Sequence, residues 1–228
     1  MTLAIFDLDN TLLAGDSDYL WGQFLVEQGL VDPVVHASQN ERFYEEYRAG
    51  TLDIYEFLDF QLAPLARLEM GELKALRTRF MAQKIGPIVL QAGRALIDAH
   101  RRRGHLPLIV TATNRFVTAP IAIELGIEHL IATEPELIDG RYTGRVSGVP
   151  CYREGKVTRL AQWIGEHGET WAGSWFYTDS SNDLPLLRLV THAVAVDPDE
   201  SLAAEARARG WDTISLRDPP DLLAARVS

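Results

Sequence analysis

The stretch that decides the fold is residues 4–16, AIFDLDNTLLAGD, in which a short apolar run ends on two carboxylates, Asp7 and Asp9. Alternate residues of a strand point to the same side, so these two side chains leave the end of the run on one face. Two carboxylates held close together repel each other, and burial increases that repulsion. The pattern therefore predicts a positively charged partner between them.

Composition sets the broad class of the protein. The chain has 228 residues, 46% of them hydrophobic, which is enough for a sizeable core. Its net charge of −10, from 22 basic and 32 acidic residues, argues against a nucleic-acid partner. Cys151 is the single cysteine, so no internal disulfide is expected. With no leader pattern and no apolar run near the ~20 residues that span a bilayer, the sequence predicts a soluble cytoplasmic protein without a membrane partner.

The chain divides into two regions with different sequence patterns. Residues 16–89 have the pattern of successive helices, whereas from residue 90 onward helices alternate with apolar strands. Alternation of this kind predicts an α/β core with a mostly parallel sheet and helices on both faces. The predicted core consists of residues 1–14 and 90–228. The predicted all-helical insertion, residues 15–89, would lie over the carboxyl ends of the strands, where open α/β sheets bind ligands.

Two local signals concern the later elements. Asp139-Gly140, between two short strand-like runs, predicts the turn of a β-hairpin. Residues 115–127 are typical of a helix, but Pro120 lies inside them. Proline interrupts helical hydrogen bonding, so this helix is expected either to be kinked or to begin later than Arg115.

Polar side chains follow the carboxyl ends of several predicted strands and open one helix. They comprise four acids, one hydroxyl and one lysine, namely Asp7, Asp9, Thr111, Lys156, Asp179 and Asp183. Because the carboxyl ends of parallel strands lie along one edge, these residues are expected to converge. Carboxylates suit Mg²⁺, and a carboxylate can also attack phosphorus as a nucleophile. Lysine and a hydroxyl can hold phosphoryl oxygens, so the set predicts Mg²⁺-dependent phosphoryl transfer.

The same residues carry a family resemblance. FDLDNTLL, the threonine of LIVTAT, the lysine of EGKVTRL and YTDSSNDLPLL resemble, in order, the four motifs of the haloacid dehalogenase superfamily. The helical insertion between the first and second motifs resembles its C1 cap, and the layout is similar to the phosphoserine-phosphatase-like branch, which includes histidinol-phosphatase-like members. The resemblance spans nearly the whole chain. It implies a Rossmann-like three-layer core with a helical cap.

The resemblance also implies roles. Asp7 would be the nucleophile, forming an aspartyl-phosphate, and Asp9 would be the general acid and base. The Asp7 carboxylate, the Asp9 backbone carbonyl and Asp179 would hold Mg²⁺, with Asp183 supporting the ion from the second shell or through water. Thr111 and Lys156 would bind the phosphoryl group, and Asn182 would help to orient the substrate.

Three residues are candidates for selecting the substrate, and their roles are left open. Asp16 matches the acidic residue that faces the substrate amine in phosphoserine phosphatases, but it also fits a helix N-cap. A cap arginine often meets the substrate carboxylate in that branch, and Arg42 and Arg48 are the candidates.

The function expected from these patterns is hydrolysis of a small phosphorylated metabolite, with phosphoserine and histidinol phosphate as the leading examples. A phosphotransferase or mutase would use the same core. A phospho-aspartate signalling module is a distant alternative, because such modules are about half this length. A P-loop is excluded, since its pattern requires glycine where Pro150 stands and serine or threonine where Val157 stands. The sequence does not indicate an oligomeric state.

Overall fold

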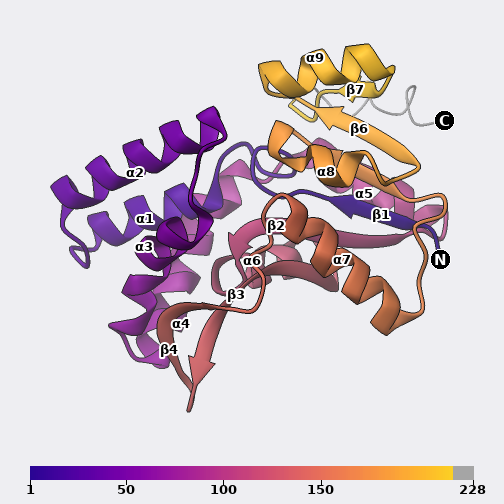
Figure 1. Ribbon diagram of the computed structural model, residues 1–228. Coiled ribbons are helices and arrows are strands. Elements are labelled where there is room, and N and C mark those ends of the chain that lie inside the picture. The colour runs from indigo at the N-terminus through magenta and orange to yellow at the C-terminus, as the bar shows by residue number, and fades with distance from the viewer. Residues whose placement is uncertain (218–228) are drawn as a thin grey trace.

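The computed structural model describes residues 1–217, apart from the side chain of Arg48. It contains one seven-stranded sheet with the strand order β4-β3-β2-β1-β5-β6-β7, flanked by helices (Figure 1). The strands are β1 (Leu3–Phe6), β2 (Leu106–Asn114), β3 (His129–Ile138), β4 (Arg141–Ser147), β5 (Trp175–Thr178), β6 (His192–Val196) and β7 (Asp212–Ile214). The helices are α1 (Ser17–Glu27), α2 (Pro33–Ala49), α3 (Ile54–Ala66), α4 (Met70–Phe80), α5 (Gln91–Arg102), α6 (Arg115–Glu124), α7 (Glu154–His167), α8 (Leu184–Leu187) and α9 (Glu200–Arg209).

Strand β1 lies at the centre of the sheet and pairs in parallel with β2 and β5. Its side chains are fully buried and alternate between the two faces. Leu3 and Ile5 belong to the core that α7, α8 and α9 cover, whereas Ala4 and Phe6 belong to the core that α5, α6 and the inserted helices share. The predicted class, a three-layer α/β core with a mostly parallel sheet, is confirmed.

The antiparallel pair at one edge is the hairpin of β3 and β4. Asp139 and Gly140 both have positive φ angles, 50° and 79°, as a two-residue turn with the twist of the flanking strands requires. The predicted hairpin turn is therefore confirmed. Beyond the sheet, β4 packs against α3 of the inserted helices.

Helix α6 begins at Arg115, so the expectation of a later start is wrong. The Asn114 side chain caps the helix by accepting a hydrogen bond from the amide of Val117 at 3.2 Å. Pro120 lies inside the helix and cannot donate to the carbonyl of Phe116 four residues earlier. Instead, Nη1 of Arg77 on α4 donates to that oxygen at 2.8 Å. A side chain of the inserted helices thus donates to the Phe116 carbonyl that Pro120 leaves without a helical donor.

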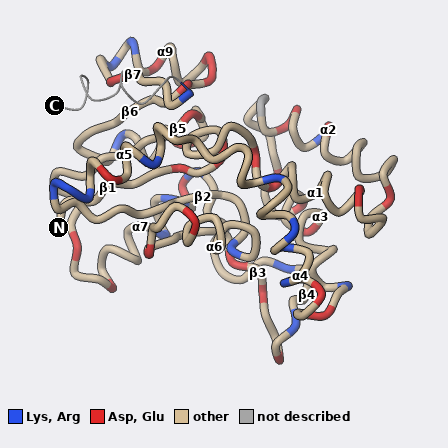
Figure 2. The backbone as a smooth tube through the Cα atoms, turned by 180° about the vertical axis from the view of Figure 1, so that it is seen from behind, with Lys and Arg blue, Asp and Glu red and all other residues tan. Residues whose placement is uncertain are grey.

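Helices α1 to α4 form the cap, which lies beside the carboxyl edge of the sheet (Figure 1). Leu13 and Val89 form a β-bridge, so the chain enters and leaves the cap along neighbouring paths. The predicted cap boundaries at residues 15 and 89 lie beside this bridge. Lysine and arginine positions are spread over both the cap and the core (Figure 2). Within residues 1–217, no helix combines the length and the apolar character that a membrane crossing needs.

Candidate active site

The loop after β1 places the first two acids at the sheet edge. The amide of Asp7 donates to the carbonyl of Tyr177 at 2.9 Å, which continues the pairing of β1 with β5. The loop then turns tightly, because the amides of Leu12 and Leu13 both donate to the carbonyl of Leu8, at 2.9 and 3.1 Å. The turn holds Asp7, which is only 7% exposed, and Asp9 at the end of the strand.

Lys156, in the first turn of α7, forms the centre of the charged cluster. Its Nζ lies 2.9 Å from Oδ1 of Asp7 and 2.8 Å from Oδ2 of Asp183. Burial by itself would lower the pKa of Lys156, but the two carboxylates outweigh burial and hold it well above its ordinary value. The lysine is therefore a fixed positive charge.

The start of α7 depends on glycine just before this lysine. A Cβ at Gly155 would lie 2.0 Å from the carbonyl oxygen of Pro150, closer than any side chain can approach. Only glycine lets the helix start this near to the preceding loop. The close approach sets the position from which Lys156 reaches the two carboxylates.

Asp179 and Asp183 come from the segment after β5. Thr11 Oγ1 donates to Oδ1 of Asp179 at 3.1 Å, which ties this segment to the loop after β1. Thr178 Oγ1 donates to Oδ2 of Asp183 at 2.6 Å. Burial, followed by the nearby charges of Asp7 and Asp183, raises the pKa of Asp179 well above its ordinary value.

Asp9 is held by groups from two other segments. Its Oδ1 accepts a hydrogen bond from the amide of Ser17 at 2.6 Å, and its Oδ2 accepts one from Thr113 Oγ1 at 2.8 Å. Burial first, and then the charge of Asp16, raises the pKa of Asp9 to about 6. The sequence analysis missed Thr113, although it lies two residues after Thr111 on β2, where strand alternation places both on one face.

These residues lie at one end of a cavity of about 960 Å³ between the core and the cap. Thr111 is buried at this end, and its Oγ1 accepts a hydrogen bond from the amide of Thr113 at 3.2 Å. Asp7, Asp9, Asp179 and Asp183 also line this end. The opposite wall consists of residues from α1, α2 and α3, so any molecule bound at the sheet edge would be enclosed by the cap.

Asp16 is both a helix N-cap and a residue of the cavity wall. It is the N-cap of α1, accepting from the amides of Asp18 and Tyr19 at 2.9 Å each, and it also lines the cavity. Asp18, which the sequence analysis missed, lines the same wall and is buried, with a hydrogen bond from Asn114 Nδ2 at 3.2 Å. Burial raises the pKa of both carboxyl groups above their ordinary values.

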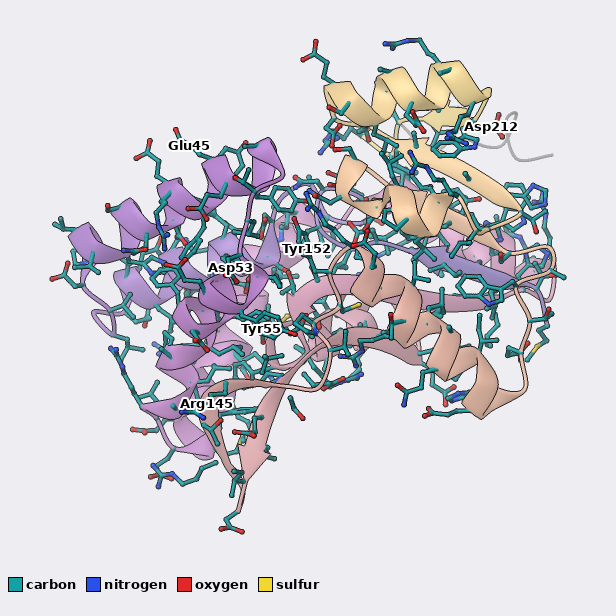
Figure 3. All side chains as sticks on the ribbon, in the orientation of Figure 1. Glu45, Asp53, Tyr55, Arg145, Tyr152 and Asp212 are labelled. Atoms are coloured by element: carbon teal, nitrogen blue, oxygen red, sulfur yellow. The ribbon has the colours of Figure 1, made fainter. Side chains whose placement is uncertain are left out.

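Asn182 and Arg42 are not among the described residues that line the cavity. Asn182 accepts hydrogen bonds from Tyr152 Oη at 3.1 Å and from Arg153 Nε at 2.9 Å. Tyr152 lies where the cap meets the core (Figure 3). Arg42 points to Glu46 and Glu56 instead of into the cavity. Arg48 lies on α2, but its side chain is outside the described residues.

The charge balance of the cluster fits a divalent cation. Asp7 and Asp183 are buried, and Asp179 is half-buried beside them. Burial is the main cause that raises the pKa of Asp7 to about 7, and burial together with the charges of Asp7 and Asp183 raises the pKa of Asp179. Among the described residues, Lys156 is the one cation that forms an ion pair with these acids. Buried carboxylates that outnumber their cation are stabilised when a metal supplies further positive charge, and oxygen ligands of this kind suit Mg²⁺.

Comparisons with known proteins show the family to which the chain belongs. Residues 4–188 match the family of haloacid dehalogenase-like hydrolases. The chain is 47% identical to a histidinol-phosphatase of Neisseria meningitidis serogroup C over 219 residues, covering 94% of this chain and 99% of that protein.

Solved structures show the same fold. A protein of unknown function from Bordetella pertussis Tohama I superposes with a TM-score of 0.89 at 44% identity, over 95% of this chain and 100% of the other. A substrate-bound phosphoserine phosphatase superposes with a TM-score of 0.70 at 18% identity, over 98% and 97%. At that identity the second likeness concerns the fold alone. The chain belongs to the haloacid dehalogenase-like hydrolases, in a branch similar to phosphoserine and histidinol phosphatases.

Proposed function

We propose that this hydrolase is a phosphomonoesterase in which Asp7 attacks the phosphorus of a small phosphorylated metabolite. The observation that carries the proposal is the pairing of Asp7 with Lys156 at 2.9 Å, beside Asp9, at the end of the cavity between the core and the cap. A lysine fixed beside a nucleophilic carboxylate balances the charge of an approaching phosphoryl group. The matched family and the 47% identical histidinol-phosphatase support the same reaction class.

The proposed reaction has two steps. First, a carboxylate oxygen of Asp7 forms a bond to phosphorus while the bond to the ester oxygen breaks, and the Asp9 carboxyl gives its proton to the leaving alkoxide. Second, Asp9 takes a proton from a water that attacks phosphorus, so that inorganic phosphate leaves and Asp7 is restored. Asp9 suits both tasks, because Ser17 and Thr113 fix its orientation and its pKa of about 6 lies near neutrality.

The phosphoryl oxygens would be held by Lys156 and Thr111, both of which line the cavity. Mg²⁺ would be held by the carboxylates of Asp7 and Asp179 and by the backbone carbonyl of Asp9, with Asp183 supporting it through water. The ion would neutralise phosphoryl charge that otherwise repels the carboxylate nucleophile.

The proposed substrate carries an amine. Asp16 and Asp18 place two carboxyl groups on the cavity wall, where a cationic amine would be complementary. Histidinol phosphate is the first candidate, because the 47% identical relative is a histidinol-phosphatase, and phosphoserine is the second. The proposed partners are small phosphorylated metabolites of this kind.

The test is phosphate release from a panel of phosphorylated metabolites that includes both candidates. Each would be incubated with Mg²⁺, with EDTA, and with the Asp7→Asn variant. Asp59→Asn is the matched control, because Asp59 is an exposed acid on α3 outside the cavity lining. Release that requires both the metal and Asp7, and that Asp59→Asn retains, supports the proposal. Release that occurs only when an alcohol acceptor is added would point instead to a phosphotransferase.

A further inference from the structure

The cavity continues into the cap, where its wall carries a polar side chain that the proposed chemistry does not use. Gln61 on α3 lines the cavity and is only 4% exposed. Its carboxamide forms no hydrogen bond with the described groups of residues 1–217, from which the Arg48 side chain is excepted. The amide therefore offers its donors and its acceptor to the cavity, where water or a bound molecule can complete its hydrogen bonds. Gln61 is thus available to contact a group bound in the cap.

Asn40 on α2 supplies a second polar atom to the same cavity. Its Nδ2 lies 3.0 Å from Nε2 of His36, and an amide nitrogen can only donate, so the ring nitrogen accepts. Burial lowers the pKa of His36, which agrees with a neutral ring. Oδ1 of Asn40 is left as an acceptor for which the described chain provides no partner.

The contacts of His36 fix the orientation of the Asn40 side chain. The His36 ring stacks on Phe60, with centroids 5.1 Å apart and an interplanar angle of 25°. The Nε2 edge of the ring lies against α1, where a Cβ at Gly22 would come within 2.2 Å of His36 Nε2. Glycine at this position leaves the space that the ring occupies, so the imidazole and the amide bonded to it are held in place.

Aromatic side chains one helical turn from each of these amides line the same cavity. Phe43 and Phe57 both line the cavity and contact each other edge to face, with centroids 5.4 Å apart. Aromatic walls favour flat rings as bound groups. The cavity of about 960 Å³ also has far more room than a phosphoryl group and a short carbon chain require.

We propose that Gln61 and Asn40 form a specificity subsite for a nitrogen heteroaromatic ring on the leaving group, with Phe43 and Phe57 as its walls. One ring N–H would donate to Asn40 Oδ1, and the other ring nitrogen would accept a hydrogen bond from the Gln61 amide nitrogen. This inference rests on the proposed function, because the ring belongs to the alcohol that the reaction releases.

Gln23 provides a matched control. It lines the same cavity, but its Nε2 already donates to Tyr19 Oη at 2.7 Å. Gln61→Leu and Gln23→Leu make the same chemical change, and only the first removes an unpartnered amide. Because the Gln61 amide has no protein partner, Gln61→Leu is expected to unfold at a urea concentration no lower than that of the unsubstituted protein.

The experiment measures kcat and KM for histidinol phosphate, which carries an imidazole ring, and for phosphoserine, which does not. Gln61→Leu is expected to lower kcat/KM for histidinol phosphate about tenfold, mainly through KM, which corresponds to the loss of one hydrogen bond. Phosphoserine turnover by Gln61→Leu, and both activities of Gln23→Leu, should change by less than about twofold. Calorimetric binding of histidinol, the phosphate-free alcohol, should weaken about tenfold in Gln61→Leu alone.

The outcomes distinguish a failure of the proposed subsite from a failure of the proposed reaction. Equal losses on both substrates, no loss in Gln61→Leu, an equal loss in Gln23→Leu, or hydrolysis of phosphoserine but not of histidinol phosphate would overturn the subsite. If the unsubstituted protein releases no phosphate while histidinol binding still weakens in Gln61→Leu, the proposed function fails and the subsite stands.

Discussion

Replacing Lys156 with methionine would remove the positive charge at the centre of the candidate site while keeping most of the side-chain volume. Lys156 Nζ forms ion pairs with Asp7 at 2.9 Å and Asp183 at 2.8 Å, and all three side chains are at most 10% exposed. Removing one partner of a buried pair leaves an uncompensated charge, which typically lowers the free energy of unfolding by about 3–5 kcal/mol. We expect a loss of this size at pH 8.

The loss should shrink as the pH falls. Burial already raises the pKa of Asp7 to about 7 in the folded state, and without the lysine it would lie still further above its value in the unfolded chain. The folded state then binds more protons than the unfolded state over that interval, so the stability of the variant falls as the pH rises. At pH 5.5 the Asp7 carboxyl group would be protonated to a larger extent, and the variant should recover part of the lost stability.

The assay is urea unfolding followed by the fluorescence of the five tryptophans at pH 8 and pH 5.5. Lys84→Met is the control, because Lys84 pairs with Glu27 at 2.7 Å on the surface, with side chains 24% and 49% exposed. A surface pair contributes only about 0–1 kcal/mol. Adding Asp183→Asn to Lys156→Met should restore part of the stability by removing one unpaired acid. Equal midpoints for the two lysine variants at both pH values would refute the reasoning.

Two further predictions concern stability. Arg153 has a φ angle of 48°, which is unfavourable by about 1–3 kcal/mol for any residue other than glycine. Arg153→Gly and Arg153→Ala lose the same side-chain contacts, but Arg153→Gly should be the more stable variant in urea unfolding, by about 1–2 kcal/mol. Equal stabilities of the two variants would contradict this. Burial, aided by His105, lowers the pKa of His100 to about 4, below its ordinary value near 6.5. The folded state therefore binds fewer protons than the unfolded state in that window, and stability should fall by about 1–2 kcal/mol between pH 7 and pH 5. His100→Phe should remove that part of the slope, and an unchanged slope would show that His100 is not its source.

The α/β core could be predicted because its signals are local. β1 is a short apolar run buried on both faces, and the residues that follow parallel strands share one edge whatever the details of packing. The order of motifs therefore indicated which segments would meet near Asp7. The start of α6 could not be read from the sequence, because the acceptor that Pro120 leaves free is used by Arg77 of a distant helix.

Contacts between segments far apart in the sequence also made the substrate-facing part of the site less predictable. Asn182 is adjacent in sequence to Asp183, yet Tyr152 and Arg153 hold its side chain, and neither contact follows from local spacing. Gln61 stands in the apolar stretch IYEFLDFQLAPLA, and nothing in that pattern tells whether its amide meets a partner or a cavity. Such residues depend on how helices pack together, which a single sequence does not specify.

The central claim is that Asp7 carries the phosphoryl group between substrate and water. The Asp9→Asn variant tests it with p-nitrophenyl phosphate, a substrate whose leaving group needs no proton from Asp9. The first step should then proceed while the second, which needs Asp9 as a base, is slowed. The account predicts a burst of about one equivalent of nitrophenolate per protein and, after acid quenching, a phosphoryl group on the peptide that contains Asp7. Steady nitrophenolate release without a burst, together with an unmodified Asp7 peptide, would show that water attacks the ester directly and would contradict the account.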